Sequence, residues 1–264
     1  MNSPTHTFIV DQLSAHVYPD VEGLGEAAAA AFAQAIRDAV ADHGSARAVV
    51  ATGNSQYPIM AALSQHDLPW DVVTVFHLDE YVGIDANHTA SFRKWIRERV
   101  EERFHPAQVN YIDGDAPDAE AEAARYDALL REAPLDVIAM GIGENGHIAF
   151  NEPHLALFDD PQWVRVVDLD DTSRQQQVNE GHFPTFDDVP RQALSVTVPA
   201  LLSAGTLVVS VPEKRKAAAV SATLREDVST AVPATALRNH SRAFLLLEPE
   251  SYSDYAATLA SPVQ

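Results

Sequence analysis

The stretch LDVIAMGIGENGHIAFNEP, residues 135–153, decides the fold, because a short apolar run leads directly into a glycine-rich segment with polar side chains. Residues 137–140 are all apolar, as in a strand that is buried on both faces. The glycines that follow allow tight turns and close approach of a ligand to the backbone. A histidine, an amide and a carboxylate come next, at His147, Asn151 and Glu152, and packing alone does not explain them there. We therefore expect the active-site strand of an enzyme.

Apolar strands alternate with amphipathic helices on both sides of this stretch. Before it we predict strands at 13–17 (an edge strand), 46–52, 72–78 and 110–112, and helices at 21–42, 57–65, 91–104 and 118–133. After it we predict strands at 164–169, 194–198, 206–211 and 243–247, and helices at 199–203, 214–224 and 248–260. Residues 1–8 are expected to be a loose tail. The long polar segment 154–193 is typical of a lid.

This order of elements predicts the α/β class: a single doubly wound, mostly parallel sheet, with helices on both faces and an irregular lid segment. No linker or repeat divides the chain, so we expect residues 1–264 to form a single α/β domain with 154–193 as a lid-like insertion. Ligands of such folds bind at the carboxyl ends of the strands. Polar clusters fall at three of these ends, at residues 53–56, 79–81 and 143–152.

Composition excludes several classes of partner. The chain has 18 basic and 38 acidic residues, a formal charge of −20, which argues against nucleic acid and anionic membranes. It has no cysteine and no apolar run of about 18 residues, and its first residues lack the basic region and the long apolar region typical of a signal peptide, so we expect a cytoplasmic protein without a membrane span. A small anionic substrate would need local cations and backbone N–H groups. The sequence leaves a homo-oligomer open.

Neither a nucleotide nor a metal is expected. Residues 141–146, which include Gly146, match the dinucleotide fingerprint G-x-G-x-x-G, but Pro153 leaves room for two helical turns at most after it. Two combinations of histidine and carboxylate match no zinc spacing: His147, Glu152 and His154, and His77, Asp79 and Glu80. We therefore predict no cofactor. A purely structural role is the alternative for His147.

Two basic or polar clusters lie at helix starts. The loop Thr52, Gly53, Asn54, Ser55 and Gln56 leads from a strand into a helix, so its N–H groups and hydroxyls could hold an anion. The alternative is an ordinary N-cap formed by the asparagine or the serine. Three cations, Lys214, Arg215 and Lys216, open a later helix, where they are unfavourable unless something negative lies nearby. This placement favours a phosphate ligand.

An acidic pair closes a core strand at Asp79 and Glu80, directly before Tyr81. Burial next to another carboxylate raises the pKa of one member toward the range of a general base. Alternatively, one of the two simply caps the following turn. We expect Glu80 to cap the following turn and Asp79 to be the member that acts as a general base.

Three segments, ATGNSQ, FHLDEYVG and GIGENGHIAFNEP, together resemble the signatures of the glucosamine-6-phosphate deaminase (isomerase) family, which shares its fold with 6-phosphogluconolactonases. The resemblance extends over residues 46–248. Lactonases lack the glutamate of FNEP and usually have DER at 79–81, so the resemblance favours the deaminase branch. It implies conversion of glucosamine 6-phosphate to fructose 6-phosphate and ammonia in amino-sugar catabolism, without a metal or redox cofactor.

The resemblance also implies roles for single residues. Asp79 matches the base that moves a proton between C2 and C1 of the open-chain sugar. His147 matches the ring-opening acid/base, supported by Glu152 and Asn145. Members of the family have aspartate or asparagine at the position of Asn145, so we expect an orienting role here. Residues Glu80, Tyr81 and Gly146 belong to the same segments as supporting positions.

For the phosphate, the resemblance implies the backbone of 53–56 with Ser55, the lysine Lys216, and Arg174 as a lid arginine that reaches the phosphate on closure. The loop reads TGNSQ where well-studied deaminases have TGGTP, and the lid segment GHFPTFDDVP at 181–190 also differs from theirs. These departures leave a related phosphosugar open as substrate. A lactonase and a non-catalytic sugar-phosphate sensor are the alternative functions.

Overall fold

A large sheet forms the centre of the computed structural model, which describes residues 3–260. Its strand order is β1-β2-β11-β10-β7-β3-β4-β6, and only β1 is antiparallel to its neighbour. The strands are β1 (His6–Val10), β2 (Leu13–Val17), β3 (Ala46–Val50), β4 (Val73–His77), β6 (Gln108–Asn110), β7 (Val137–Met140), β10 (Thr206–Val211) and β11 (Ala243–Leu247). The predicted doubly wound, mostly parallel sheet is confirmed.

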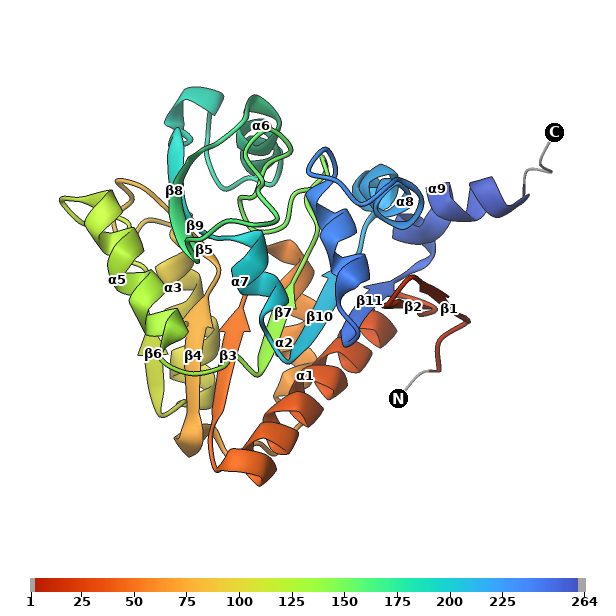
Figure 1. Ribbon diagram of the computed structural model, residues 1–264, viewed down its shortest axis with the longest axis horizontal. Helices are drawn as coiled ribbons and strands as arrows, with labels where there is room; N and C mark the ends of the chain where they lie inside the picture. The colour runs from red at the N-terminus through yellow and green to blue at the C-terminus, as the bar shows by residue number, and fades with distance from the viewer. Residues whose placement is uncertain (1–2, 261–264) are drawn as a thin grey trace.

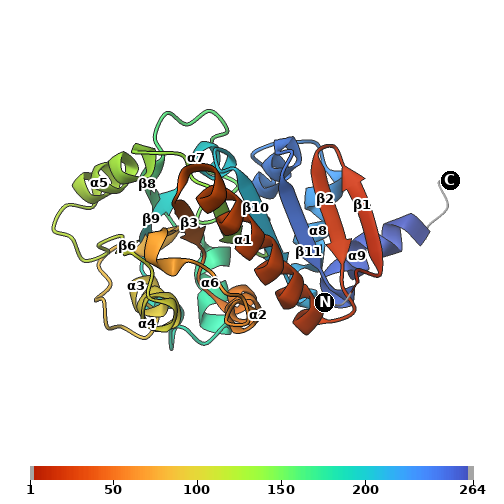
Figure 2. The same ribbon diagram turned by 90° about the horizontal axis from the view of Figure 1, so that it is seen from below.

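Helices cover both faces of this sheet, because alternate residues of each strand point to opposite sides. In β7, Val137 and Ala139 pack in one core with α1 (Val21–His43), α2 (Tyr57–Leu63) and α3 (Phe92–Ile96). Ile138 and Met140 pack in the other core with α5 (Ala119–Arg131), α7 (Val198–Leu202) and α8 (Ala217–Arg225). Figure 2 shows α1 running obliquely across the sheet. The strand at the centre of the sequence pattern is thus also central in the sheet.

Two further helical elements continue these layers. α3 passes through a π-helical segment, Arg97–Glu101, into α4 (Glu102–Phe104), so the predicted helix 91–104 is largely right but not regular. The last helix, α9 (Pro249–Ala260), packs against α8. No helix in the described part of the chain is long and apolar enough to cross a membrane.

A second, three-stranded antiparallel sheet was not predicted. It consists of β5 (Asp79–Tyr81), β9 (Gln192–Val196) and β8 (Val164–Asp168). In Figure 1 this sheet and α6 (Asp171–Asn179) lie together at one end of the large sheet. Asp79 therefore does not end a core strand: the chain leaves β4 at His77 and enters a different sheet two residues later.

The loose tail expected for residues 1–8 is wrong for the described residues from His6 onward, and residues 1–2 lie outside the description. His6–Val10 pairs with β2 along its whole length, so β1 and not 13–17 is the edge strand. The reason is tertiary: Phe8 stacks on Tyr255 with ring centroids 5.4 Å apart and also contacts Tyr252 of α9. A partner more than 240 residues away leaves no trace in the local pattern.

Candidate active site

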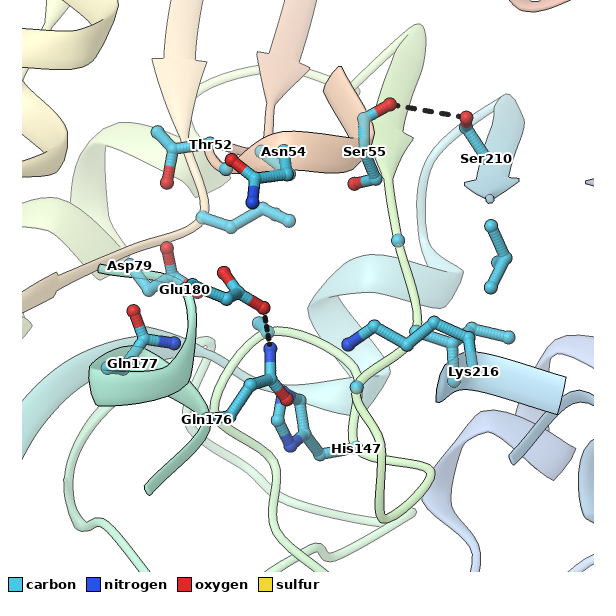
Figure 3. A pocket seen from close by; sticks show the side chains of 18 of the residues that line it. Thr52, Asn54, Ser55, Asp79, His147, Gln176, Gln177, Glu180, Ser210 and Lys216 are labelled. Atoms are coloured by element: carbon cyan, nitrogen blue, oxygen red, sulfur yellow. Dashed lines mark hydrogen bonds between the residues drawn. The ribbon is translucent and has the colours of Figure 1, made fainter. Parts of the chain in front are cut away.

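A cleft lies where the carboxyl ends of β3, β4, β7 and β10 meet α6. It encloses about 790 Å³, open solvent included. The residues singled out from the sequence that line it include Thr52, Gly53, Asn54, Ser55, Asp79, His147, Arg215 and Lys216. Figure 3 shows side chains from the 52–55 loop, from Asp79 and from Lys216 converging on the same space. The structure thus brings together clusters that are up to 164 residues apart in the chain, from Thr52 to Lys216.

Asp79 faces the cleft at the start of β5. Its carboxylate makes no hydrogen bond to any of residues 3–260, although the side chain is largely buried. Burial, and then the charge of Glu80, raise the pKa of Asp79 to about 8. A carboxyl group with this pKa exchanges a proton readily near neutral pH.

Glu80 has the capping role predicted for it. Its carboxylate accepts hydrogen bonds from the hydroxyl of Ser91 (2.8 Å) and from the N–H groups of Tyr81, Phe92 and Arg93 (3.0, 3.1 and 2.8 Å). Burial raises the pKa of Glu80, and these hydrogen bonds oppose that rise. Glu80 lies outside the cleft lining and fixes the start of α3 against β5. Tyr81 is fully buried beside it and also lies outside the lining.

His147 enters the cleft from the loop after β7. Nδ1 lies 3.4 Å from Oε2 of Glu152 and 3.1 Å from the hydroxyl of Ser173. Burial alone would raise the pKa of Glu152, but His147, Ser173 and Asn145 lower it to about 2. Glu152 is therefore a carboxylate at neutral pH, and it orients the imidazole. The structural alternative for His147 does not account for its place in the cleft lining.

Asn145 supports this pair from outside the cleft lining. Its amide nitrogen donates to Glu152 (2.7 Å) and to Asp170 (3.0 Å), and its oxygen accepts from the N–H of His147 (3.0 Å). Gly146 next to it has a φ of +84°, a conformation that favours glycine. Gly143 makes room for the imidazole, since a Cβ there would lie 2.3 Å from Nε2 of His147. The predicted orienting role of the asparagine fits these contacts.

The loop after β3 is not an ordinary N-cap. No side-chain hydrogen bond caps the 3₁₀ turn Asn54–Gln56 or α2 behind it. Ser55 and Asn54 instead line the cleft, where Gly141 allows the Ser55 hydroxyl to approach closely. Gln56 is fully buried, donates to the Ser55 hydroxyl (3.0 Å) and does not line the cleft.

Arg174 does not reach the cleft in this structure. Its guanidinium donates to the carbonyl oxygens of Phe186 (2.9 Å) and Val189 (3.1 Å) and lies 4.0 Å from the centre of the Phe186 ring. It therefore holds the end of the 154–193 segment to α6. The guanidinium that does line the cleft is that of Arg215, next to Lys216.

The sequence did not single out the groups that α6 and the residues just after it contribute to the cleft lining: Gln176 and Gln177 lie in α6, and Glu180 and His182 follow it. The missed signal is an N-cap: Asp170 accepts from the N–H of Ser173, and no proline or glycine follows before residue 181. Ser210 at the end of β10 was missed as well; its hydroxyl lies 3.4 Å from the carbonyl oxygen of Ser55. Among residues 3–260, no three metal-ligating side chains are grouped as a metal site.

Comparison with known proteins adds to this geometry. A family model described as glucosamine-6-phosphate isomerases/6-phosphogluconolactonase matches residues 19–246. A protein named glucosamine-6-phosphate deaminase from Streptococcus uberis is 33% identical over 215 residues, which are 80% of this chain and 88% of that protein. One of the same name from Exiguobacterium sp. is 34% identical over 210 residues, which are 80% of this chain and 81% of that protein.

Solved structures have the same fold. A monomeric glucosamine-6-phosphate deaminase is similar with a TM-score of 0.83 and 29% identity, over 91% of this chain and 99% of that one. A 6-phosphogluconolactonase from Shewanella baltica has a TM-score of 0.75 at 19% identity, over 91% of this chain and 99% of that one. At that identity the second likeness concerns the fold alone.

Proposed function

The chain belongs to the family of glucosamine-6-phosphate isomerases and 6-phosphogluconolactonases, and from this premise we propose that it is a glucosamine-6-phosphate deaminase. The resemblance found in three sequence segments is thereby confirmed at the level of the family. The choice of reaction rests on the environment of Asp79. Its carboxyl group faces the cleft without a hydrogen-bond partner among residues 3–260, and its pKa is raised to about 8.

The proposed chemistry needs two proton-transfer groups and a phosphate anchor. His147 moves the proton between the O1 hydroxyl and the ring oxygen, which opens the pyranose, while Glu152 stabilises the imidazolium that forms transiently. Asp79 then takes the proton from C2 and returns it to C1, while the amine loses a proton and O1 gains one, so that C1 becomes an alcohol and C2 an imine. The resulting C2 imine adds water and releases ammonia, which leaves fructose 6-phosphate. Every step uses side chains that line the cleft or contact one that does.

The remote phosphate positions the reacting carbons. Figure 3 shows Asn54, Ser55 and Lys216 around the same space as Asp79. The backbone of 53–56 and Lys216 are the proposed phosphate ligands. We also propose that residues 154–193 act as a lid over a single domain, and that the enzyme works in the cytoplasm on a small phosphosugar.

Ammonia release from glucosamine 6-phosphate tests this function. The purified protein should release one ammonia per fructose 6-phosphate formed, and Asp79→Asn should bind the sugar but release ammonia ~10²–10⁴ times more slowly. A panel of amino-sugar and keto-sugar phosphates, assayed for ammonia and for isomerisation, identifies the preferred substrate. Absence of ammonia from every amino sugar in the panel would overturn the proposal.

The lactonase alternative has a separate test. Lactonases of this fold lack the glutamate of FNEP, so we expect hydrolysis of 6-phosphogluconolactone not to require the carboxylate of Glu152. A Glu152→Gln variant should therefore lose deaminase activity. Rapid lactone hydrolysis that is unaffected by this substitution would favour the lactonase.

A further inference from the structure

Arg215 lines the cleft and lies at the centre of a group of charges. Three carboxylates contact it: Glu180 and Glu144 at Nη1 (2.5 and 3.2 Å) and Glu213 at Nε (2.6 Å). Its Nη2 donates to none of residues 3–260. The guanidinium thus has a free donor at the edge of the cleft.

Glu180 is the member of this group that comes from the lid segment. It follows α6 directly and is almost fully buried in the cleft lining, where Oε1 also accepts from Gln176 (2.7 Å) and Oε2 lies 3.3 Å from His182. Burial would raise the pKa of Glu180, but His182, Arg215 and Lys216 lower it to about 2. At neutral pH it is a carboxylate. Its side chain extends into the space between Asp79 and Lys216 (Figure 3).

Lys216 provides the second cation at this end. It is buried at the end of the turn that opens α8, and its amino group makes no hydrogen bond or ion pair to residues 3–260. Arg174, the guanidinium that the family resemblance implied for the phosphate, is held outside the cleft by two carbonyl groups. Arg215 is therefore the guanidinium that stands next to Lys216 in the lining.

We propose that Arg215 and Lys216 bind the substrate phosphate together, and that Glu180 occupies Arg215 until the phosphate displaces it. The proposal rests on the proposed function in that it assumes a phosphorylated substrate. A phosphate dianion and a carboxylate on one guanidinium repel each other, and in a partly buried site that repulsion is weakly screened. Glu180 therefore acts as an internal competitor of the phosphate, and exchange frees the end of α6 from Arg215.

Inorganic phosphate is the probe, with binding measured by calorimetry on the full chain. Glu180→Gln should bind phosphate at least ~10-fold more tightly than the parent protein, because the competing charge is gone. Glu144→Gln is the matched control: it removes the same charge from the same guanidinium nitrogen, but Glu144 lies outside the cleft lining. It should change the affinity by ~2-fold or less. An equal gain in phosphate affinity in both variants would mean that only the loss of negative charge matters, and the proposal that Glu180 competes with phosphate would be wrong.

Arg215 needs its own variants. Arg215→Gln should weaken phosphate binding ~10-fold or more, and Arg215→Lys, which keeps the charge if the neutral variant fails to fold, should weaken it by an intermediate factor. If both Arg215→Gln and Arg215→Lys bind phosphate as tightly as the parent protein, Arg215 is not part of the phosphate site. None of these measurements involves turnover, so a failure here is distinct from a failure of the deaminase assay.

Two further readouts separate displacement from other roles of Glu180. On addition of phosphate, amide hydrogen exchange in residues 171–180 should become faster in the parent protein and should not change in Glu180→Gln, in which the ion pair is already absent. Slower exchange in the parent protein would mean that phosphate closes this segment, contrary to the proposal. If Glu180→Gln instead binds inorganic phosphate like the parent but glucosamine 6-phosphate more weakly, Glu180 recognises the amino group and the proposal is wrong.

Discussion

Nδ1 of His77 lies 2.9 Å from the backbone carbonyl oxygen of Asp79. A carbonyl group only accepts, so Nδ1 carries the proton, and Nε2 is left to accept from the N–H of Ile112 at 2.9 Å. Burial lowers the pKa of His77 to about 3, against the effect of its hydrogen bond to Asp79 and with a smaller contribution from Arg93. The neutral imidazole therefore fixes the peptide at which the chain passes from β4 to β5.

Substitution of this histidine should affect both stability and rate. His77→Phe leaves the Asp79 carbonyl and the Ile112 N–H buried without partners, so we expect a loss of ~2–4 kcal/mol in the free energy of unfolding. It should also lower kcat more than it changes KM, because the proposed base is displaced. Denaturant unfolding and steady-state kinetics measure the two effects. His77→Asn, which keeps a donor and an acceptor, should be affected less; equal losses in both variants would contradict this role.

The pH dependence of the reaction should report Asp79. A base acts in its ionised form, and the pKa of Asp79 is raised to about 8, so kcat/KM should increase with pH up to about 8 before it levels. The measurement is a pH profile of ammonia release with a substrate whose phosphate titrates well below that range. An increase centred near pH 4, the ordinary value of an aspartate, would show that the buried environment does not control the base.

Gly143 should be required for the position of the histidine and not for folding. A Cβ at this position would lie 2.2–2.5 Å from three imidazole atoms of His147, so Gly143→Ala must turn the ring away from Glu152. We expect a ~10²-fold or larger loss of kcat/KM with a shift in the unfolding midpoint of only a few degrees. Gly181→Ala, a control outside the cleft lining, introduces backbone strain at a φ of +79° and should affect stability and not rate. Equal activity of Gly143→Ala and the parent protein would argue against the proposed role of His147.

Acid should destabilise the protein partly through Glu152. Its pKa is about 2 in the folded state and 4.5 in the reference state, so its contribution to stability is complete above about pH 4.5 and is lost as pH falls toward 2. Up to about 3 kcal/mol is at stake, since one pKa unit corresponds to ~1.4 kcal/mol. The free energy of unfolding, measured with urea at a series of pH values between 5 and 2.5, should decrease less steeply with falling pH for Glu152→Gln than for the parent protein. An equal decrease of this free energy with pH in both proteins would mean that other carboxylates account for the acid sensitivity.

The order of strands and helices could be predicted because apolar runs such as 137–140 and the amphipathic face of α1 are local patterns. The second sheet could not, since β5 has three residues and its partner β9 lies more than 110 positions away. The strand β1 was missed for a similar reason: its apolar neighbour is Tyr255 of α9. Because their partners are distant in the chain, the local sequence of β5 and of β1 does not show that these segments form strands.

In the cleft, Asp79, His147 and the 52–55 loop were found because each belongs to a short polar segment that comes after an apolar strand of the large sheet. Arg174 was expected there on the basis of resemblance, but its place is set by carbonyl groups of the following loop. Glu180 was not predicted, because a carboxylate in a polar segment reads as a solvated surface residue. Only the fold places it opposite Arg215.

The small sheet holds the proposed proton-transfer residues together and leaves the segment around the end of α6 separate from them. Ser195 of β9 stands opposite Asp79 of β5, and its hydroxyl accepts from the N–H of Phe150, so the base strand is tied to the loop that carries His147. Residues 175–190 belong to neither of these strands; they reach the cleft through a few side chains near the end of α6. Descendants of one ancestor could therefore exchange this segment and acquire a new substrate while the proton-transfer geometry passes on unaltered.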